Sequence, residues 1–414
     1  MPDRAVNQAH YVDERSDRSY PLTDPLRWRG DDGAPLSVSR LPGIARDRVD
    51  TARRSLWRYR AALPAPLAEA APVSLGEGCT PLLDGEWNGV PVSFKTEWAN
   101  PTGSFKDRGT SVLISFLAHH GVTDVIEDSS GNGGSSVAAY CAAAGIRARI
   151  LVPEATSPAK VLQARAYGAE VELVPGDREA TATEALRRAA TTPYASHNWH
   201  PFFLQGVKTL AYELWEDLGF RAPDAVVTVA GAGSTVLGCD LGFGELLAAG
   251  QIDRLPRLLV AQPANCAPIH ASFRAGAESP VPYDAAPTVA EGTAIRHPVR
   301  LPEVLRAVRR SGGEMTAVPE AAIEDAVRRL AAKGLYAEPT SATAAAAVDD
   351  FAARGLIVPG ERTVVVLTGS GLKAAGAMQR IILGGDGDGD GDGDGDGDGD
   401  GDGDGDGDGD GGAS

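Results

Sequence analysis

Short apolar runs alternate with longer amphipathic stretches along most of this chain. The runs have the length and the content of β-branched residues that are typical of buried strands, and several lead into glycine-rich turns. The expected strands are residues 90–96, 123–128, 149–152, 170–174, 225–230, 258–262 and 363–367. Strands that alternate with helical patterns predict parallel β-α-β units. We therefore expect an α/β fold with twisted, mostly parallel sheets flanked by helices.

The stretches between these runs carry helical patterns and helix-end signals. Residues 110–117 present an apolar face, and Ser157 with Pro158 supplies an N-cap and a first-turn proline for a helix that Gly168 closes. Further helices are expected at residues 47–61, 177–190 and 236–249.

Charge is concentrated at the C-terminal end of the chain. The net charge of −17 includes 13 aspartates of a strict Gly-Asp repeat, and without them the charge is about −4. The folded part therefore gives no reason to expect nucleic-acid or membrane binding. Residues 384–414 have almost no apolar side chain to bury and repel one another, so we expect a disordered tail. Weak binding of divalent cations is the alternative for this tail, although it lacks the pattern of an EF-hand.

The cysteines and the first residues of the chain limit the classes of protein that the sequence can encode. The four cysteines have no C-x-x-C spacing, so we expect neither a disulfide framework nor a metal site. Residues 1–20 lack the apolar core of a signal peptide, and no apolar run approaches the ~18 residues of a membrane span. A cytoplasmic protein is expected.

One lysine lies where a turn changes into a helix. Residues 100–109 read N-P-T-G-S-F-K-D-R-G, in which Asn-Pro and Thr-Gly are turn signals and Ser104 is a candidate helix cap. Lys106 then lies near a helix N-terminus, which disfavours a protonated amine and suits a neutral nucleophile. A solvated surface lysine is the alternative if this residue is considered alone.

Three further loops follow expected strands. Residues 129–134 read S-S-G-N-G-G, residues 231–235 read G-A-G-S-T, and residues 368–371 read T-G-S-G. A glycine-rich turn before a helix binds anions through converging backbone N–H groups, although it can also be a tight connection without a ligand. A nicotinamide site is the poorer interpretation of residues 231–235, because the third glycine and the downstream acidic residue of that fingerprint are missing.

These motifs together resemble those of the fold-type II pyridoxal-phosphate enzymes, the tryptophan synthase beta-like family. Residues 100–109 are most similar to the cofactor-lysine segment of threonine synthases, and residues 75–82, L-G-E-G-C-T-P-L, resemble the segment that precedes their first sheet. The resemblance extends from about Gly76 to Lys373. It implies two α/β domains with pyridoxal 5′-phosphate in the cleft between them.

The resemblance also implies a division of the chain. Residues 40–109 and 196–383 are expected to form the larger, cofactor-binding domain, and residues 110–195 the smaller, mobile one. Residues 1–39 form an N-terminal extension, for which an ordered segment and a partly disordered arm both remain open. A homodimer is expected.

Site residues carried over from the resemblance fall on the motifs above. Lys106 would hold the cofactor covalently and remove a substrate proton, with Phe105 beside it. Asn132 would contact the cofactor's 3′-oxygen, and Thr368 the pyridine nitrogen. The expected phosphate-binding residues are Gly231, Ala232, Gly233, Ser234 and Thr235. The expected residues for the substrate carboxylate are Ser130, Gly131, Asn132 and Gly133.

Two further polar residues have open roles. Glu338 is expected either to orient the cofactor ring or to cap a helix. His200 lies among aromatic residues, where a packed or exposed histidine is more common than an acid or base. Cys266 is interpreted as a small buried residue.

The implied function is that of a lyase acting on an amino acid, with threonine-synthase-like conversion of O-phosphohomoserine and water to threonine and phosphate. Two departures leave the substrate open: residues 231–235 lack an asparagine that many threonine synthases have, and Ser370 stands where they commonly have histidine. The alternative is β-replacement or β-elimination, as in a cysteate synthase or a threonine or serine dehydratase. A non-catalytic cofactor-binding homologue is more remote, because such a protein has little need of Lys106.

Overall fold

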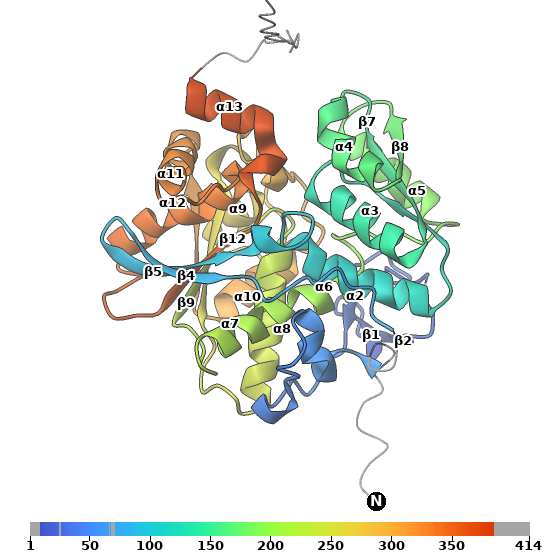
Figure 1. Ribbon diagram of the computed structural model, residues 1–414, viewed down its shortest axis with the longest axis horizontal. Coiled ribbons are helices and arrows are strands. Elements are labelled where there is room, and N and C mark those ends of the chain that lie inside the picture. The colour runs from blue at the N-terminus through green and yellow to red at the C-terminus, as the bar shows by residue number, and fades with distance from the viewer. Residues whose placement is uncertain (1–8, 25, 66, 68–70, 385–414) are drawn as a thin grey trace, which may run out of the picture.

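Two β-sheets flanked by helices organise the chain, and a third, small sheet lies near the N-terminus (Figure 1). This computed structural model describes residues 9–24, 26–65, 67 and 71–384. Residues 385–414, and with them the expected disordered tail apart from Gly384, lie outside the described residues. Among the described helices, none has both the length and the apolar character needed to cross a bilayer.

The elements follow one another in the alternation expected from the sequence. The strands are β1 (His10–Asp13), β2 (Arg18–Pro21), β3 (Ser37–Val38), β4 (Leu82–Trp87), β5 (Val90–Thr96), β6 (Asp124–Glu127), β7 (Arg147–Pro153), β8 (Glu170–Val174), β9 (Ala225–Val229), β10 (Arg257–Pro263), β11 (Glu314–Val318) and β12 (Thr363–Leu367). The α-helices are α2 (Lys106–His119), α3 (Asn132–Ala144), α4 (Pro158–Ala166), α5 (Arg178–Arg188), α6 (Pro201–Val207), α7 (Thr209–Asp217), α8 (Ser234–Ala248), α9 (Pro268–Arg274), α10 (Leu301–Arg310), α11 (Glu320–Ala332), α12 (Pro339–Ala353) and α13 (Ala375–Leu383). The 3₁₀ helices are η1 (Arg46–Arg48), η2 (Leu56–Ala62), η3 (Glu97–Ala99), η4 (Ala264–Cys266), η5 (Glu291–Thr293) and η6 (Gly371–Ala374).

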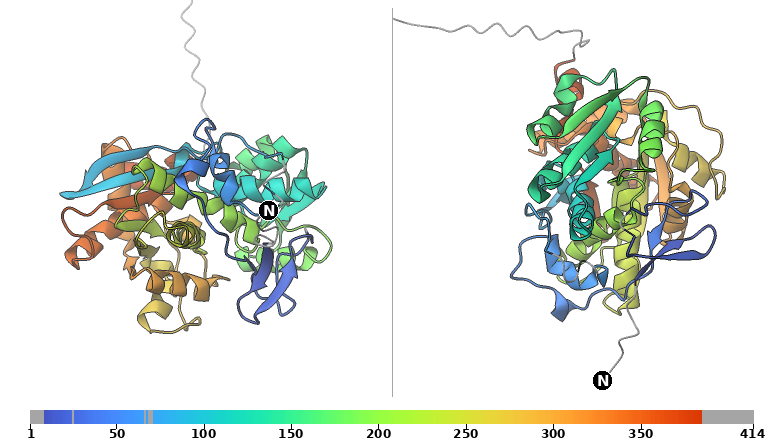
Figure 2. Two further views of the ribbon diagram at one scale, coloured as in Figure 1. Left: turned by 90° about the horizontal axis from the view of Figure 1, so that it is seen from below. Right: turned by 90° about the vertical axis from the view of Figure 1, so that its right-hand side faces the viewer.

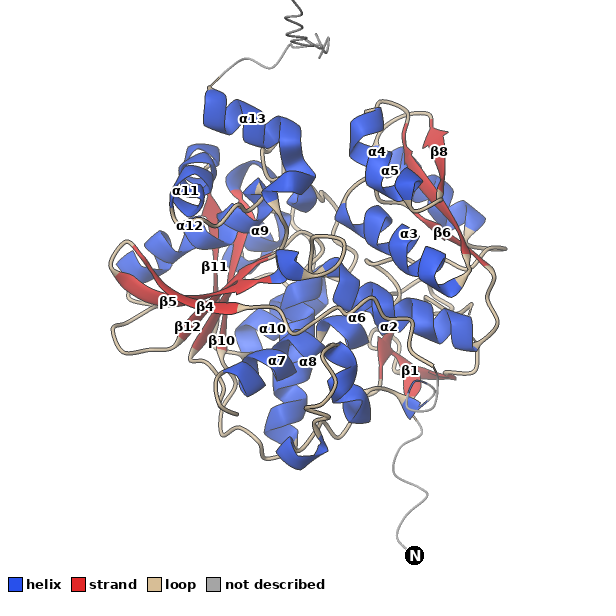
Figure 3. Cartoon of the chain, in the orientation of Figure 1, coloured by secondary structure: helices blue, strands red, loops and turns tan. Residues whose placement is uncertain are grey.

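The larger sheet has six strands in the order β11-β10-β9-β12-β5-β4, and all its pairs are parallel except β4 with β5. Helices cover both faces, with α11 and α12 on one and α8 and α10 on the other (Figure 3). Successive strand residues enter opposite cores: Val226 and Val364 pack with α8 and α10, whereas Val227 and Val365 pack with α12. Burial on both faces explains why these strands are continuous apolar runs.

The smaller sheet contains the parallel strands β6, β7 and β8 in that order. Helix α3 packs on it, and α5 contacts all three of its strands. Helix α2 packs against both α3 and α6, and its residues share one core with those of α3. The N-terminus of α2 therefore lies where the elements of the two sheets meet.

The described residues of the N-terminal extension include a small sheet that packs on the rest of the chain. Strands β2-β1-β3 form an antiparallel sheet at the periphery of the molecule (Figure 2). Buried Arg300 fixes this segment by donating from Nη2 to the backbone oxygen of Leu36 at 2.8 Å. The side chain of Tyr11 is buried and packs edge-on against Phe202.

Two local predictions were wrong. Residues 47–61 do not form an α-helix; this stretch contains the short 3₁₀ helices η1 and η2. Ser104 does not cap α2, because Phe105 occupies the cap position and the Ser104 hydroxyl is buried with no partner among the described residues. The backbone of Ser104 instead forms a β-bridge with Gly369, which holds the residue in an extended conformation.

Candidate active site

Lys106 is the first residue of α2, and the turn before it is joined to the loop that follows β12. The backbone N–H of Phe105 donates to the oxygen of Thr368 at 2.9 Å, and the N–H of Ser370 donates to the oxygen of Gly103 at 3.1 Å. These bonds place Lys106 beside Thr368, although the two residues are far apart in the sequence. The sequence-predicted lysine and the predicted ring-nitrogen partner are thus brought together.

Asp107 fixes the same turn from the next position. Its buried carboxylate accepts from the backbone N–H and the hydroxyl of Thr102, both at 2.6 Å, and from the hydroxyl of Ser136 in α3 at 2.6 Å. Burial raises the pKa of Asp107 to about 6, while these hydrogen bonds lower it. The lysine turn is therefore tied to α3 as well as to β12.

A buried ion network lies on the other side of the turn. The guanidinium of Arg108 is fully buried and pairs with Glu97 at 2.6 Å and with Glu213 at 2.8 Å. Glu213 also pairs with buried Lys95 at 2.7 Å, and it accepts from the backbone N–H of Thr80 at 2.8 Å. Burial alone would raise the pKa of Glu213, but Arg108 and Lys95 hold it below its ordinary value. Thr80 belongs both to the L-G-E-G-C-T-P-L segment and to this network. The segment therefore helps to hold the lysine turn in place.

The amine of Lys106 lies among aromatic rings and has an altered basicity. Its Nζ is 4.9 Å from the ring centroid of Phe105 and 5.6 Å from that of Phe203. Burial lowers the pKa of Lys106 to about 7, while the Glu127 carboxyl raises it and the Arg178 guanidinium lowers it. The lowered pKa makes the unprotonated amine, which a nucleophile requires, more accessible than it is for an ordinary lysine.

The S-S-G-N-G-G loop connects β6 to the N-terminus of α3. Ser130, Gly131 and Asn132 are half-buried at the start of this helix, and a side chain on Gly131 would meet open space. Gly133 is closely packed, because a Cβ there would come within 2.7 Å of His197 Nδ1. The loop thus presents backbone N–H groups of a helix N-terminus on its open side.

Glu338 lies directly against this loop. The Asn132 Nδ2 donates to both Glu338 carboxyl oxygens at 3.2 Å. Glu338 occupies the N-cap position of α12, but its side chain makes no capping hydrogen bond. Burial raises the pKa of Glu338 to about 7, while Asn132 and Lys373 lower it.

The G-A-G-S-T loop leads from β9 into α8, with Gly231 and Ala232 half-buried before the helix. Gly233 has φ +87° and a Cβ there would come 2.2 Å from Val304 Cγ2, so only glycine fits. Ser234 starts the helix, and the Thr235 hydroxyl donates into the fold, to the Val229 oxygen at 3.1 Å. The first turn of α8 leaves backbone N–H groups without intrahelical acceptors, which suits a phosphate.

Gly233→Ala is expected to weaken cofactor binding by about tenfold or more, because the added methyl group must displace either Val304 or the loop. Equilibrium titration of the cofactor-free chain with pyridoxal phosphate measures this change. Gly244→Ala is the matched control on the same helix, since a Cβ at this position meets open space. Equal affinities of the two variants would contradict a phosphate site at this loop.

Thr368 directly follows β12 and has a hydroxyl neighbour, Ser341, that the sequence analysis missed. Its Oγ1 is 3.1 Å from Ser341 Oγ, and the Ser341 hydroxyl also accepts from the N–H of Gly369 at 2.8 Å. The single Ser341 proton can go either to Thr368 or to the Gly369 oxygen at 3.0 Å. When it goes to Thr368, the Thr368 hydroxyl can donate to another acceptor, such as a ring nitrogen.

The structure also shows the surroundings of Lys373, which the sequence analysis missed, and of His200 and Cys266. Lys373 donates to Ser135 Oγ at 2.8 Å and also contacts Gln163 Oε1, so it connects the loop after β12 to α3 and α4. His200 is buried among aromatic rings, and burial lowers its pKa to about 3, which favours packing over acid–base chemistry. Cys266 is buried, as its interpretation as a packed residue requires.

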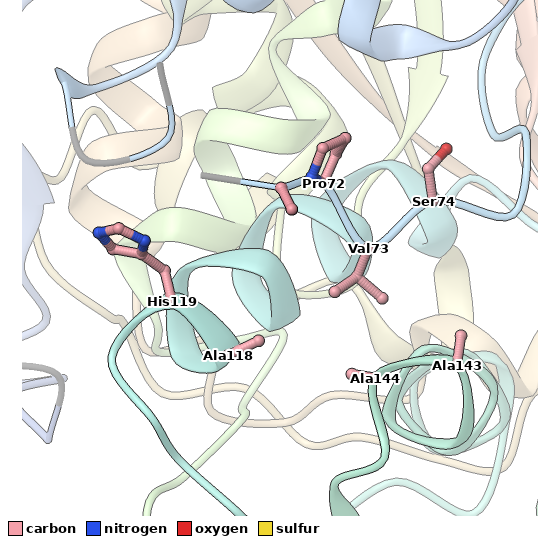
Figure 4. Close-up of a pocket in the computed structure, with 8 residues that line it drawn as sticks. Pro72, Val73, Ser74, Ala118, His119, Ala143 and Ala144 are labelled. Carbon is pink, nitrogen blue, oxygen red and sulfur yellow. The ribbon is translucent and has the colours of Figure 1, made fainter. Parts of the chain in front are cut away.

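A hollow of about 460 Å³ lies elsewhere, between residues 71–74 and the C-terminal turns of α2 and α3 (Figure 4). Its lining includes Ala118 and His119, which are about 18 Å along the helix from Lys106 by the rise of an α-helix. It is therefore separate from the candidate site.

The residues present fit pyridoxal phosphate. They supply an amine whose pKa is lowered to about 7, a helix N-terminus behind a glycine that admits no Cβ, and a hydroxyl, that of Thr368, able to donate or accept a hydrogen bond. Fold and site thus define a cofactor-dependent α/β enzyme of fold type II. Residues 73–369 match the family described as "Pyridoxal-phosphate dependent enzyme", and the chain belongs to this family.

Curated relatives and solved structures agree with this assignment. The chain is 35% identical to the threonine synthase of Methanocaldococcus jannaschii over 80% of this chain and 83% of the relative. It is 35% identical to the threonine synthase of Synechocystis sp. over 77% of this chain and 84% of that protein. The crystal structure of the T.th. threonine deaminase aligns with a TM-score of 0.59 and 26% identity, over 70% of this chain and 92% of that one. The chain is therefore a pyridoxal-phosphate-dependent lyase.

Proposed function

We propose that this lyase is threonine-synthase-like and converts O-phosphohomoserine and water to threonine and phosphate. The identity to curated threonine synthases over four fifths of the chain supports the substrate class. The observation that carries the chemistry is the Lys106 amine, whose pKa is lowered to about 7 by burial at the start of α2. When bound, pyridoxal phosphate supplies an electron sink for a carbanion at the substrate's α-carbon.

Each of the chain's own groups has a task in this proposal. Lys106 Nζ binds the cofactor aldehyde and then, once freed by the substrate, accepts the proton from the α-carbon. The N-terminus of α8, with residues 231–235, binds the cofactor phosphate, and Thr368 orients the ring. The loop at residues 130–133 binds the substrate carboxylate, and Asn132 contacts the ring oxygen.

Elimination from serine or threonine is the second candidate. The similarity to the T.th. threonine deaminase favours it, as does the absence of asparagine from residues 231–235. Ser370, which stands where histidine is common in threonine synthases, caps η6 by accepting from the N–H of Leu372 at 3.2 Å. β-Replacement, as in a cysteate synthase, belongs to the same class.

A substrate panel separates these candidates. We expect phosphate release from O-phosphohomoserine with threonine identified by mass spectrometry. The second candidate, elimination or β-replacement, would be selected if the protein did not turn over O-phosphohomoserine. It would instead form a keto acid from threonine or serine, or a sulfite-dependent product from O-phosphoserine. Two controls measure the non-enzymatic reaction. One is heat-treated protein, and the other is cofactor-loaded protein that has been reduced with borohydride.

We also propose that residues 110–195 move as a unit towards the rest of the chain when substrate binds. The side-chain contacts of Asn132 with Glu338, and of Lys373 with Ser135, are the kind of contact that such a movement makes and breaks. A homodimer and a cytoplasmic location remain predictions from the sequence.

A further inference from the structure

Glu338 is a buried carboxyl at the point where two loops of the candidate site meet. It is 6% exposed, and among the described residues its side chain accepts hydrogen bonds only from Nδ2 of Asn132, at 3.2 Å to each carboxyl oxygen. It occupies the N-cap position of α12 without making a capping hydrogen bond. Burying a carboxyl costs free energy that a single amide partner offsets only in part, so this position needs an explanation other than helix capping.

The backbone fixes Glu338 against the loop that follows β12. Its N–H donates to the oxygen of Gly369 at 3.1 Å, and a β-bridge joins the neighbouring Ala337 to Ser370. A Cβ on Gly369 would come 2.4 Å from Glu338 Oε1, so the carboxyl occupies the space that a side chain at this position would fill. The same loop contains Thr368, the expected partner of the cofactor's ring nitrogen.

Asn132 approaches Glu338 from the elements of the other sheet. It is the first residue of α3, which packs on the smaller sheet, whereas α12 packs on the larger one. The pair therefore connects the loop before α3 to the loop after β12. These are the two loops expected to contact the cofactor's 3′-oxygen and its ring nitrogen.

The chemistry of the two side chains determines which end of the amide faces Glu338. An ionised carboxyl only accepts hydrogen bonds, while an asparagine amide has two donors on its nitrogen and an acceptor oxygen. Both Glu338 oxygens lie at the same distance from Nδ2 of Asn132, and the oxygens of one carboxyl are close enough together to share one N–H. The second N–H of Asn132 has no partner among the described residues.

We propose that Glu338 is a positioning residue that acts through Asn132. By accepting one N–H, it holds the amide nitrogen in place and leaves the second N–H for the cofactor's 3′-oxygen. An amide without this acceptor is free to turn and present its own oxygen, which would repel the electron-rich 3′-oxygen. Because Glu338 is fixed to the loop after β12, it also sets the position of Asn132 relative to Thr368. This inference rests on the proposed cofactor site, whichever substrate that site takes.

The cofactor affinities of two uncharged variants test the proposal. Glu338→Met removes every acceptor, whereas Glu338→Gln keeps one oxygen that can accept from Nδ2 of Asn132. Since both variants lack the charge, the difference between them measures the hydrogen bond alone. The full-length chain, freed of cofactor, is titrated with pyridoxal phosphate. Glu338→Gln is expected to bind it about fivefold more tightly than Glu338→Met, which is the effect of one hydrogen bond.

An Asn132→Ala background decides whether Glu338 acts through Asn132. In this background Glu338→Gln and Glu338→Met should give equal affinities, because the acceptor has no amide to hold. A difference that persists without Asn132, or equal affinities in the chain that has Asn132, would overturn the proposal. The expected differences without turnover of O-phosphohomoserine would instead overturn the proposed substrate and leave this inference standing.

Asp349→Leu is the matched control, because Asp349 also accepts a hydrogen bond from an asparagine. Its Oδ1 accepts from Nδ2 of Asn88 at 2.7 Å. Asp349 lies near the other end of α12, about 16 Å from Glu338 by the rise of an α-helix. Unchanged cofactor affinity is expected. A loss as large as that of Glu338→Met would mean that the effect comes from α12 as a whole, and would contradict the proposed role.

A measurement on the wild-type chain covers the case in which Glu338→Met does not fold. The side-chain N–H signals of Asn132 are assigned by nuclear magnetic resonance through their loss in Asn132→Ala. One of the two protons is expected to exchange with solvent about tenfold more slowly than those of an exposed asparagine, and the other to become slow only when cofactor binds. Fast exchange of both protons in the cofactor-loaded chain would refute the inference.

Discussion

Lys106→Ala is expected to abolish covalent capture of pyridoxal phosphate and to lower turnover about a thousandfold or more. Both effects have one cause, because the same amine is proposed to bind the aldehyde and to move the substrate proton. Absorbance of the cofactor-loaded chain and steady-state rates on the best substrate of the panel measure them. Borohydride reduction followed by peptide mass spectrometry should place the tag of the wild-type protein on Lys106.

Lys373 is the matched control for the position of the tag. It is another lysine near the site, and burial lowers its pKa to about 8, so it is a second candidate for reaction with the aldehyde. Lys373→Ala is expected to keep the tag on Lys106. A tag on Lys373 in the wild-type chain, or cofactor-supplemented protein that stays colourless, would refute the assignment of the lysine.

Arg108→Met should lower the free energy of unfolding by about 3–5 kcal/mol, because removal of the guanidinium leaves the buried Glu97 carboxylate without its ionic partner and Glu213 with Lys95 alone. Glu97 and Glu213 pair with Arg108 at 2.6 and 2.8 Å, and the Arg108 and Glu97 side chains are fully buried. Denaturant titrations at several pH values measure the change. The loss should shrink as the pH falls, because the raised folded-state pKa of an unpaired carboxyl lets it take up a proton and become neutral.

Arg187→Met serves as the control for this stability change. Arg187 also pairs with a glutamate, Glu184 at 2.7 Å, but 71% of its side chain is exposed. Exposed pairs contribute little, so no measurable change is expected. If the two variants unfolded at the same denaturant concentration, the buried network would not support the lysine turn as described.

The strands were the part of the fold that the sequence predicted best. The expected limits of 170–174 and 363–367 are those of β8 and β12, because both runs are apolar or alternating and end at turn residues. Strands β1, β2, β3, β4 and β11 were missed. Of these, β3 has only two residues, which carry no periodicity. The prediction of an α-helix at residues 47–61 failed because the buried residues there, such as Leu56 and Tyr59, are also compatible with the tighter turns of η2.

Some residues of the candidate site could be predicted from the sequence, and others could not. Lys106 and the three glycine-containing loops were visible as local strings, and the structure brings Lys106 beside Thr368 through backbone bonds. Pairs formed by the tertiary fold, such as Asn132 with Glu338 and Glu127 with His197, join residues 206 and 70 positions apart. The pairing itself has no local signal, since a glutamate or histidine considered alone is compatible with many partners.

Strand β12 lies between β9 and β5 in the larger sheet but is the last strand among the described residues. During synthesis on the ribosome, β5 and β9 therefore cannot pair with β12, the strand between them, until residues 363–367 have been made. Until then both present unpaired apolar edges, which are sites of self-association. Nascent chains that stall before this strand should consequently need a chaperone more than completed ones do.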